Sequence, residues 1–142
     1  MDNYISASNE QGQQFYYTFK NKGKIVMLNL MRFKELADYS SLEAIAPESP
    51  ISGKEAYTQY LECVLPLFTK AGAKVLFYGD AGAFLIGPGT ESWNAMLLVE
   101  HQSVAEFMKF ANDEAYLKIA GHRTAALEDS RLLPHTENSS IG

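Results

Sequence analysis

The sequence has a single cysteine and no run of basic residues. Cys63 alone can form neither an intramolecular disulfide nor a cluster of thiolate metal ligands. The 142 residues carry a formal net charge of −5, whereas nucleic-acid partners require clustered positive charge. We therefore expect no disulfide and no nucleic-acid partner.

Long apolar segments are also missing. No apolar stretch reaches the roughly 18 residues that a membrane-spanning helix needs, and the first residues, MDNYISASNEQ, lack the basic and apolar regions of a secretory signal. Hydrophobic residues make up 46% and charged residues 20% of the chain, which is ordinary for a globular domain. These features predict one soluble, reduced, cytoplasmic domain without a membrane partner.

An apolar run at residues 23–33, GKIVMLNLMRF, predicts a central β-strand. Its apolar residues hardly alternate with polar ones, which indicates that both faces of the strand are covered. Helices can cover one face, and a second subunit is the simplest cover for the other. Asn29 and Arg32 interrupt the run with opposite parity, so their side chains are expected on opposite faces.

Downstream, two capping boxes mark helix starts. Ser52 with Glu55 opens a long amphipathic helix that ends at Gly72, and Ser103 with Glu106 opens a second helix. This second helix is expected to restart after residue 112 and to break again at residue 121. Apolar runs predict the remaining strands at residues 73–78, 83–87, 93–100 and 130–133.

This order of elements is the split β-α-β-β-α-β arrangement of an α+β, ferredoxin-like plait with an antiparallel sheet. Residues 1–22 are predicted to form a helical arm packed on the domain of residues 23–135, and residues 136–142 to form a flexible tail. One face of such a sheet has no helices. Because that face is apolar here, two sheets are expected to pack together in a homodimer.

Three segments resemble the domain-of-unknown-function family 1330, which lies within the dimeric α/β-barrel superfamily. They are VMLNLMRF at 26–33, SGKEAYTQY at 52–60 and HRTAALEDSRLLP at 122–134, and the resemblance extends over about residues 10–135. It implies a ferredoxin-like fold and a barrel-forming homodimer. It brings no established activity, so no catalytic residue is carried over. Distant members of the superfamily include cofactor-free monooxygenases, isomerases and haem enzymes, and shared fold does not choose among them.

Two polar residues of the central strand are candidates for ligand binding. Asn29 can hold a ligand carbonyl or hydroxyl, or it can be satisfied by neighbouring backbone or by Tyr57. Arg32 can bind a carboxylate, or it can form a structural salt bridge with Asp129 or Glu128.

Further candidates come from the helices. His122 is the candidate general base and Arg123 the candidate anion holder, unless both only satisfy a helix end, with Arg123 bridging to Asp129. Tyr57 and Tyr60 share a helix face and belong either to the core or to a pocket wall. No spacing of His, Cys, Asp or Glu predicts a metal site, and we expect no cofactor.

The sequence therefore supports a cofactor-independent enzyme acting on a small organic acid or aromatic compound in a pocket between sheet and helices. The alternatives are a non-catalytic module that binds a metabolite in the same pocket and a structural dimer without a pocket.

Overall fold

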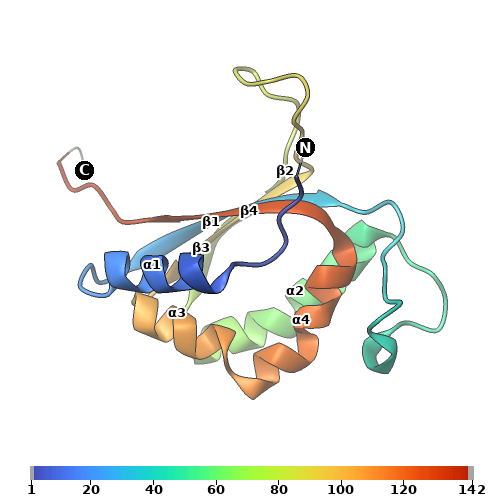
Figure 1. Cartoon of the computed structure of the whole chain (residues 1–142), viewed down its shortest axis with the longest axis horizontal. Coiled ribbons are helices and arrows are strands. Elements are labelled where there is room, and N and C mark those ends of the chain that lie inside the picture. Colours follow the sequence, from blue (N-terminus) through green and yellow to red (C-terminus); the bar gives the residue numbers. More distant parts are fainter. Residues whose placement is uncertain (1, 141–142) are drawn as a thin grey trace.

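The computed structural model describes residues 2–140 as a four-stranded antiparallel sheet with helices on one face (Figure 1). The chain runs in the order α1 (Asn9–Phe19), β1 (Ile25–Phe33), the short 3-10 helix η1 (Glu43–Ile45), α2 (Gly53–Lys70), β2 (Lys74–Asp80), β3 (Ala95–His101), α3 (Val104–Ala111), α4 (Glu114–Ala126) and β4 (Leu127–His135). The strand order across the sheet is β2-β3-β1-β4. This is the ferredoxin-like plait, so the predicted fold class is confirmed.

Strand periodicity decides which side chains form the core. Alternate residues of β1 and β3 are buried against the helices, because successive side chains in a strand point to opposite faces. They meet the apolar stripe of α2 in one cluster, whose central members are Met31, Leu97, Val99, Tyr57, Tyr60 and Val64. Full burial of one such side chain contributes about 1.5–3 kcal/mol, so this layer is a main source of stability.

The predicted start of α2 is confirmed. The Ser52 hydroxyl accepts a hydrogen bond from the Glu55 amide, and the Glu55 carboxylate accepts one from the Ser52 amide, both at 3.0 Å. The helix continues past Pro66 to Lys70. Gly53 lies so close to β1 and α4 that a Cβ atom there would be 2.2 Å from the Lys34 carbonyl oxygen. Glycine is therefore required where α2 meets the sheet.

The expected strand at residues 83–87 is wrong. These residues belong to a loop of residues 81–94, the β2–β3 loop, which projects from the sheet on the side opposite the helices (Figure 1). The last bond across its base joins the Ala81 amide to the Asn94 carbonyl at 2.8 Å. Beyond that point the apolar residues have no neighbouring strand with which to form a ladder.

The expected helix break at Gly121 is also wrong, because α4 runs without interruption from Glu114 to Ala126. Gly121 instead allows η1 and the segment before it to approach α4. A Cβ atom at this position would be 2.7 Å from Ile45 Cδ1 and 3.1 Å from Leu42 Cδ2. The glycine marks a close contact between segments, not the end of a helix.

The N-terminal arm lies beside α3 under the sheet (Figure 1). Ser8 and Gln11 form a capping box at the start of α1, and the Phe15 ring meets the Phe107 ring edge-on at 5.5 Å. Residue 1 of the arm and residues 141–142 of the predicted tail lie outside the described residues. The division into arm, domain and tail stays a prediction.

The sheet face opposite the helices is largely apolar. Leu28, Leu30 and Leu98 are half-buried there, while Phe77 and Leu133 are each 54% exposed. The strand registers bring these side chains together, since Leu28 pairs with Leu98 and with Leu133. We call this surface the open face. Within residues 2–140, no helix combines the length and apolarity needed to span a bilayer.

Candidate functional site

A cavity of about 930 Å³ lies between the N-terminal arm, the helix-covered face of β1 and β4, and helices α3 and α4. This volume is within the range of small-molecule sites. Most of its wall is apolar, with Phe15, Phe19, Met27, Phe107, Met108 and Leu132 as the main contributors. Because α1 supplies one complete wall, the cavity depends on the docking of the arm.

Arg123 is one of two arginines in the cavity wall. It lies in the last turn of α4, and Ser130 faces it from β4. Its Nη1 donates to the Ile5 carbonyl at 2.7 Å, and its Nη2 donates to Ser130 Oγ at 3.4 Å. Ser130 Oγ donates in turn to the Tyr4 carbonyl at 2.5 Å. The guanidinium thus ties the N-terminal segment to α4 and β4.

The positive charge of Arg123 has no carboxylate partner within residues 2–140. Its field extends into the core: burial raises the pKa of Tyr57 and of Tyr60, and the nearby guanidinium partly opposes the rise. A half-buried cation beside an apolar wall is a favourable partner for an anion, because surrounding low-polarity groups screen the attraction less than water does.

Asn29 lies on the helix-covered face of β1 but is absent from the cavity wall. It shares that face with the lining residue Met27 and pairs in register with Leu132 of β4. Its Nδ2 donates to the backbone carbonyls of Leu97 at 3.2 Å and Met27 at 3.4 Å. Backbone therefore satisfies the amide, as one alternative predicted, and Tyr57 does not.

His122 belongs to a different environment from its neighbour Arg123. Its Nδ1 is 2.7 Å from the Tyr39 hydroxyl, in the layer where η1 packs against α4. Burial lowers the pKa of the imidazole, so the ring is predominantly neutral at pH 7. His122 is not a cavity-lining residue. The structure therefore does not bring the candidate base and the candidate anion holder into one site.

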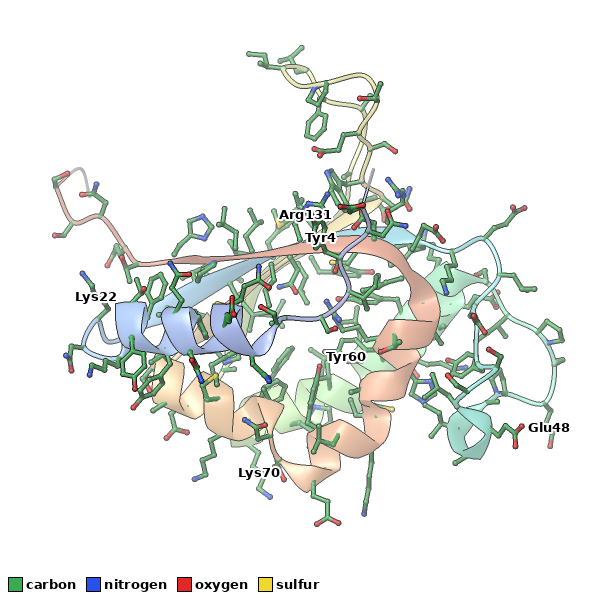
Figure 2. All side chains as sticks on the ribbon, in the orientation of Figure 1. Tyr4, Lys22, Glu48, Tyr60, Lys70 and Arg131 are labelled. Atoms are coloured by element: carbon green, nitrogen blue, oxygen red, sulfur yellow. The ribbon has the colours of Figure 1, made fainter. Side chains whose placement is uncertain are left out.

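Tyr57 and Tyr60 are part of the core. The Tyr60 hydroxyl is 2.9 Å from the Tyr116 hydroxyl, and the Tyr57 hydroxyl donates to Met31 Sδ at 3.8 Å. Figure 2 shows Tyr60 inside the layer between the helices and the sheet. Neither side chain lines the cavity.

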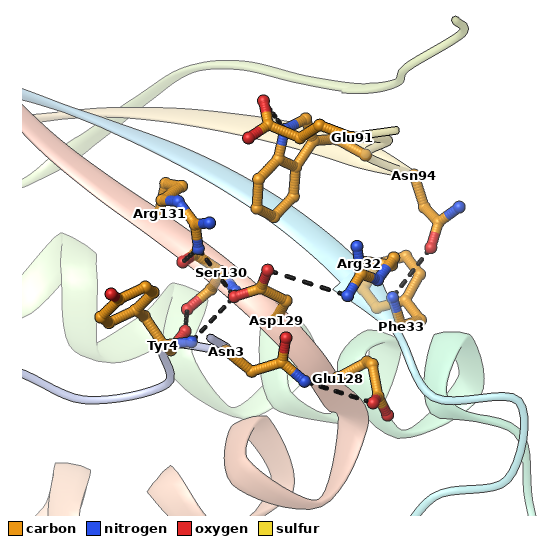
Figure 3. Close-up of polar contacts among 11 residues, drawn as sticks. Asn3, Tyr4, Arg32, Phe33, Glu91, Asn94, Glu128, Asp129, Ser130 and Arg131 are labelled. Atoms are coloured by element: carbon orange, nitrogen blue, oxygen red, sulfur yellow. Dashed lines mark hydrogen bonds and ion pairs between the residues drawn. The ribbon is translucent and has the colours of Figure 1, made fainter. Parts of the chain in front are cut away.

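Arg32 lies on the open face, as its parity predicts. Its Nη2 is 3.8 Å from Asp129 Oδ2, while Arg131 donates to Asp129 Oδ1 at 2.7 Å (Figure 3). The predicted pair of Arg32 with Asp129 is confirmed. The expected bridge from Arg123 to Asp129 is wrong, because Asp129 faces the open side with Arg32, while Arg123 bonds to Ile5 and Ser130 on the helix-covered side. The Arg131 guanidinium lies over the rings of Tyr4 and Trp93, each at 4.9 Å.

Sequence reasoning did not identify Ser130, Arg131 or the apolar wall made by α1. The parity of β4 places Asp129 and Arg131 on one face, but the pairing with β1 that brings Arg32 beside them depends on register. Across residues 2–140, no three His, Cys, Asp or Glu side chains are grouped to hold a metal ion.

The comparisons with known proteins identify the family. The model for the domain of unknown function DUF1330 matches residues 44–134. The chain belongs to the DUF1330 family. A protein of unknown function from Rhodopseudomonas palustris is similar over 96% of this chain and 98% of its own, with 34% identity and a TM-score of 0.85.

More distant solved structures share only the fold with this DUF1330 chain. Hydroxynitrile lyase from Passiflora edulis aligns with a TM-score of 0.52 and 16% identity, covering 85% of this chain and 99% of its own. A putative antibiotic biosynthesis monooxygenase from Caulobacter crescentus aligns with a TM-score of 0.50 and 10% identity, covering 88% and 98%. No protein with curated annotation matches the chain.

Proposed function

We propose that this DUF1330 chain binds a small organic acid with an apolar body in the cavity under α1, with its carboxylate on Arg123. The observation that carries the proposal is the guanidinium beside an apolar wall, without a carboxylate partner in the described chain. A guanidinium has five N–H donors. Two of them are used by Ile5 and Ser130, which leaves donors for a charge-assisted bond to a ligand.

The apolar wall supports a ligand with a hydrocarbon or aromatic body. Phe15, Phe107 and Leu132 place two aromatic rings and a branched side chain in this wall, and each buried CH₂ contributes about 0.8 kcal/mol. Arg123 then binds the carboxylate of the ligand, and the apolar wall packs against its hydrocarbon or aromatic part.

Binding without chemical conversion fits this cavity better than catalysis. The ionisable residues of its wall are two arginines and a tyrosine, and none of them is suited to remove a proton at neutral pH. The enzymatic alternative assigns that task to His122. It predicts turnover that disappears in His122→Ala. The binding function predicts that the ligand is recovered chemically unchanged and that His122→Ala does not alter its Kd.

The test is a thermal-shift and calorimetric titration with hexanoic, decanoic and phenylacetic acids, each compared with its neutral amide. We expect the acids to raise Tm and the amides to have little effect, because only the acids neutralise the guanidinium. Arg123→Gln should weaken acid binding about tenfold or more, Arg123→Lys less, and the exposed-site control Lys20→Gln not at all. Equal binding of acids and amides, or no binding of either, contradicts the proposal.

We also propose that the chain forms a homodimer through its open face. Support comes from the apolar surface around Leu28, where Phe77 and Leu133 are each 54% exposed, since exposed contiguous apolar surface marks an interaction site. Sedimentation equilibrium should give a dimer, and Leu28→Lys should shift it to monomer. A wild-type chain that stays monomeric at all concentrations contradicts this assembly.

A further inference from the structure

The β2–β3 loop carries the most exposed aliphatic side chains among the large hydrophobic residues of the described chain. Leu85 is 97% exposed and Ile86 is 91% exposed. From residue 81 to residue 90 the loop, AGAFLIGPGT, contains no charge. Exposed apolar side chains grouped on an uncharged segment are typical of surfaces that a partner covers.

The loop has defined internal contacts that present these two residues. At its tip the Phe84 ring packs on Gly87, where a Cβ atom would be 2.6 Å from the ring. At its base, Trp93 is buried under the Arg131 guanidinium. Phe84 is therefore partly used within the loop, while Leu85 and Ile86 are left facing outward.

The direction of the loop relates it to the open face. It leaves the sheet on the side opposite the helices, the same side as Leu28 and Leu133 (Figure 1). A second sheet stacked on the open face would lie about 10 Å away. The 14 residues from 81 to 94 run out and back, so about seven residues at about 3.3 Å each allow a reach of roughly 20 Å. The loop is long enough to pass beside the whole second sheet.

We infer that the tip of the β2–β3 loop docks on a second copy of this chain, beyond the stacked sheets and against the edge or helix layer of that copy. The inference rests on the proposed homodimer. A two-fold axis makes the contact reciprocal, so each chain would hold the other with its own loop. The stacked sheets then bury the open face, and the docked loop tips bury Leu85 and Ile86, in one assembly.

A lipid bilayer is the rival occupant for an exposed aliphatic tip. Peripheral membrane segments combine apolar residues with lysine or arginine, which bind anionic headgroups. Residues 81–94 contain neither, and the chain carries a net charge of −5. The charge therefore favours a second copy over a membrane.

The experiment compares Leu85→Asp/Ile86→Asp with Leu117→Asp, which alters a 59% exposed leucine on α4. Sedimentation equilibrium should show a dimer Kd raised about tenfold or more by the tip variant and unchanged by the control, because desolvated anchors dominate interfaces. A dimeric wild type with an unchanged Kd in the tip variant overturns the inference and leaves the homodimer standing. A monomeric wild type overturns both.

Two further measurements locate the tip. Leu85→Cys, in a Cys63→Ser background and labelled with a benzophenone maleimide, should crosslink to a second chain at its edge strand or helix layer. Crosslinks confined to the same chain overturn the inference. A second outcome also overturns the inference: the wild type co-sediments with anionic phospholipid vesicles, the tip variant does not, and the dimer Kd is the same for both proteins.

Discussion

His101 is a buried histidine at the end of β3, packed among the rings of Phe68, Phe107 and Phe110. Burial lowers the pKa of its imidazole to about 4, because the apolar surroundings disfavour the charged ring. The sequence pattern suggested for Glu100-His101 only half of a metal site, which strand parity argued against, and it did not predict this burial. The neutral ring behaves as a fourth aromatic residue of this cluster.

This pKa predicts a loss of stability in mild acid. Between pH 6.5 and pH 4 the His101 imidazole is protonated in the unfolded chain but stays neutral in the folded chain. The free energy of unfolding is therefore at its full value above pH 6.5 and falls as the pH approaches 4. The free energy of unfolding should drop by roughly 3 kcal/mol, at about 1.4 kcal/mol per pH unit. Urea unfolding at pH 7, 6, 5 and 4 measures it. His101→Phe should remove most of the slope, and an unaltered slope would contradict the assignment.

Asp129 is the other buried ionisable group with a clear consequence. Burial by itself raises the pKa of its carboxyl, but hydrogen bonds from the Tyr4 amide, Arg131 and the Ser130 amide outweigh burial and hold the pKa below its usual range. The carboxylate therefore joins β4, the N-terminal segment and the open-face arginines.

Asp129→Ala should lower the free energy of unfolding by about 3 kcal/mol at pH 7, because it leaves two cations and two amides without their acceptor. Asp129→Asn, which retains an acceptor oxygen, should cost less. Since the folded pKa is depressed, this contribution is complete above about pH 4 and is lost progressively as the pH falls from there through the lower folded pKa. Urea unfolding at pH 7 and pH 3 should therefore show variant and wild type converging in acid. A difference that persists undiminished at pH 3 refutes this role.

At the scale of elements, two glycines inside helices predict opposite effects of the same substitution. Gly53→Ala should destabilise the fold by more than 2 kcal/mol, because its Cβ would meet backbone atoms of Lys34 and Ala126 within 2.7 Å. Gly12→Ala in α1 meets nothing within 4 Å and should stabilise by up to about 1 kcal/mol through helix propensity. Denaturant unfolding of both variants checks the pair, and equal effects would contradict it.

Helix α1 is held chiefly by aromatic side chains, and this predicts the behaviour of the cavity wall. Phe15→Ala removes the contact with Phe107 and should increase hydrogen exchange across α1 and weaken ligand binding. Tyr17→Ala, at an exposed position of the same helix, should do neither. If α1 amides exchange equally in both variants, Phe15 does not hold the helix.

The sequence predicted those elements whose determinants are local. The apolar run of β1 and the box of Ser52 with Glu55 each depend on a few neighbouring residues, and both are confirmed. Residues 83–87 were misassigned because an apolar run looks alike in a strand and in an exposed loop. Gly121 was misassigned because its role is a contact with Leu42 and Ile45, which lie far away in the sequence.

The candidate site was predictable only in part for the same reason. Arg123 could be selected as a cation in an unusual context, and it does line the cavity. The adjacent His122 could not be separated from it, because only the packing of η1 on α4 turns that ring toward Tyr39. The wall containing Phe15 exists only once α1 has docked, and no local pattern in residues 9–19 specifies the surface on which the helix docks.

At the scale of the molecule, the sheet separates the two proposed functions. Arg123 faces the cavity on the helix-covered side, whereas Leu28 lies on the open face. Two links join them. In the N-terminal segment, Tyr4 lies over Arg131 on one side and Ile5 accepts from Arg123 on the other. In β4, Ser130 accepts from Arg123 through its hydroxyl and from Arg131 through its carbonyl. Leu28 pairs with Leu98 and Leu133 and has no bond to the N-terminal segment.

Ligand binding and dimerisation should therefore be nearly independent. Leu28→Lys should leave the Kd for an organic acid unchanged, Arg123→Gln should leave the dimer Kd unchanged, and the double variant should combine the two effects within about 0.5 kcal/mol, as distant sites without shared partners do. Calorimetry gives the Kd for the acid and sedimentation equilibrium gives the dimer Kd for the wild type, the two single variants and the double variant, which together form a double-mutant cycle. A larger coupling would mean that the segment around Tyr4 transmits a change at Arg123 to the open face, and Tyr4→Ala should then abolish that coupling.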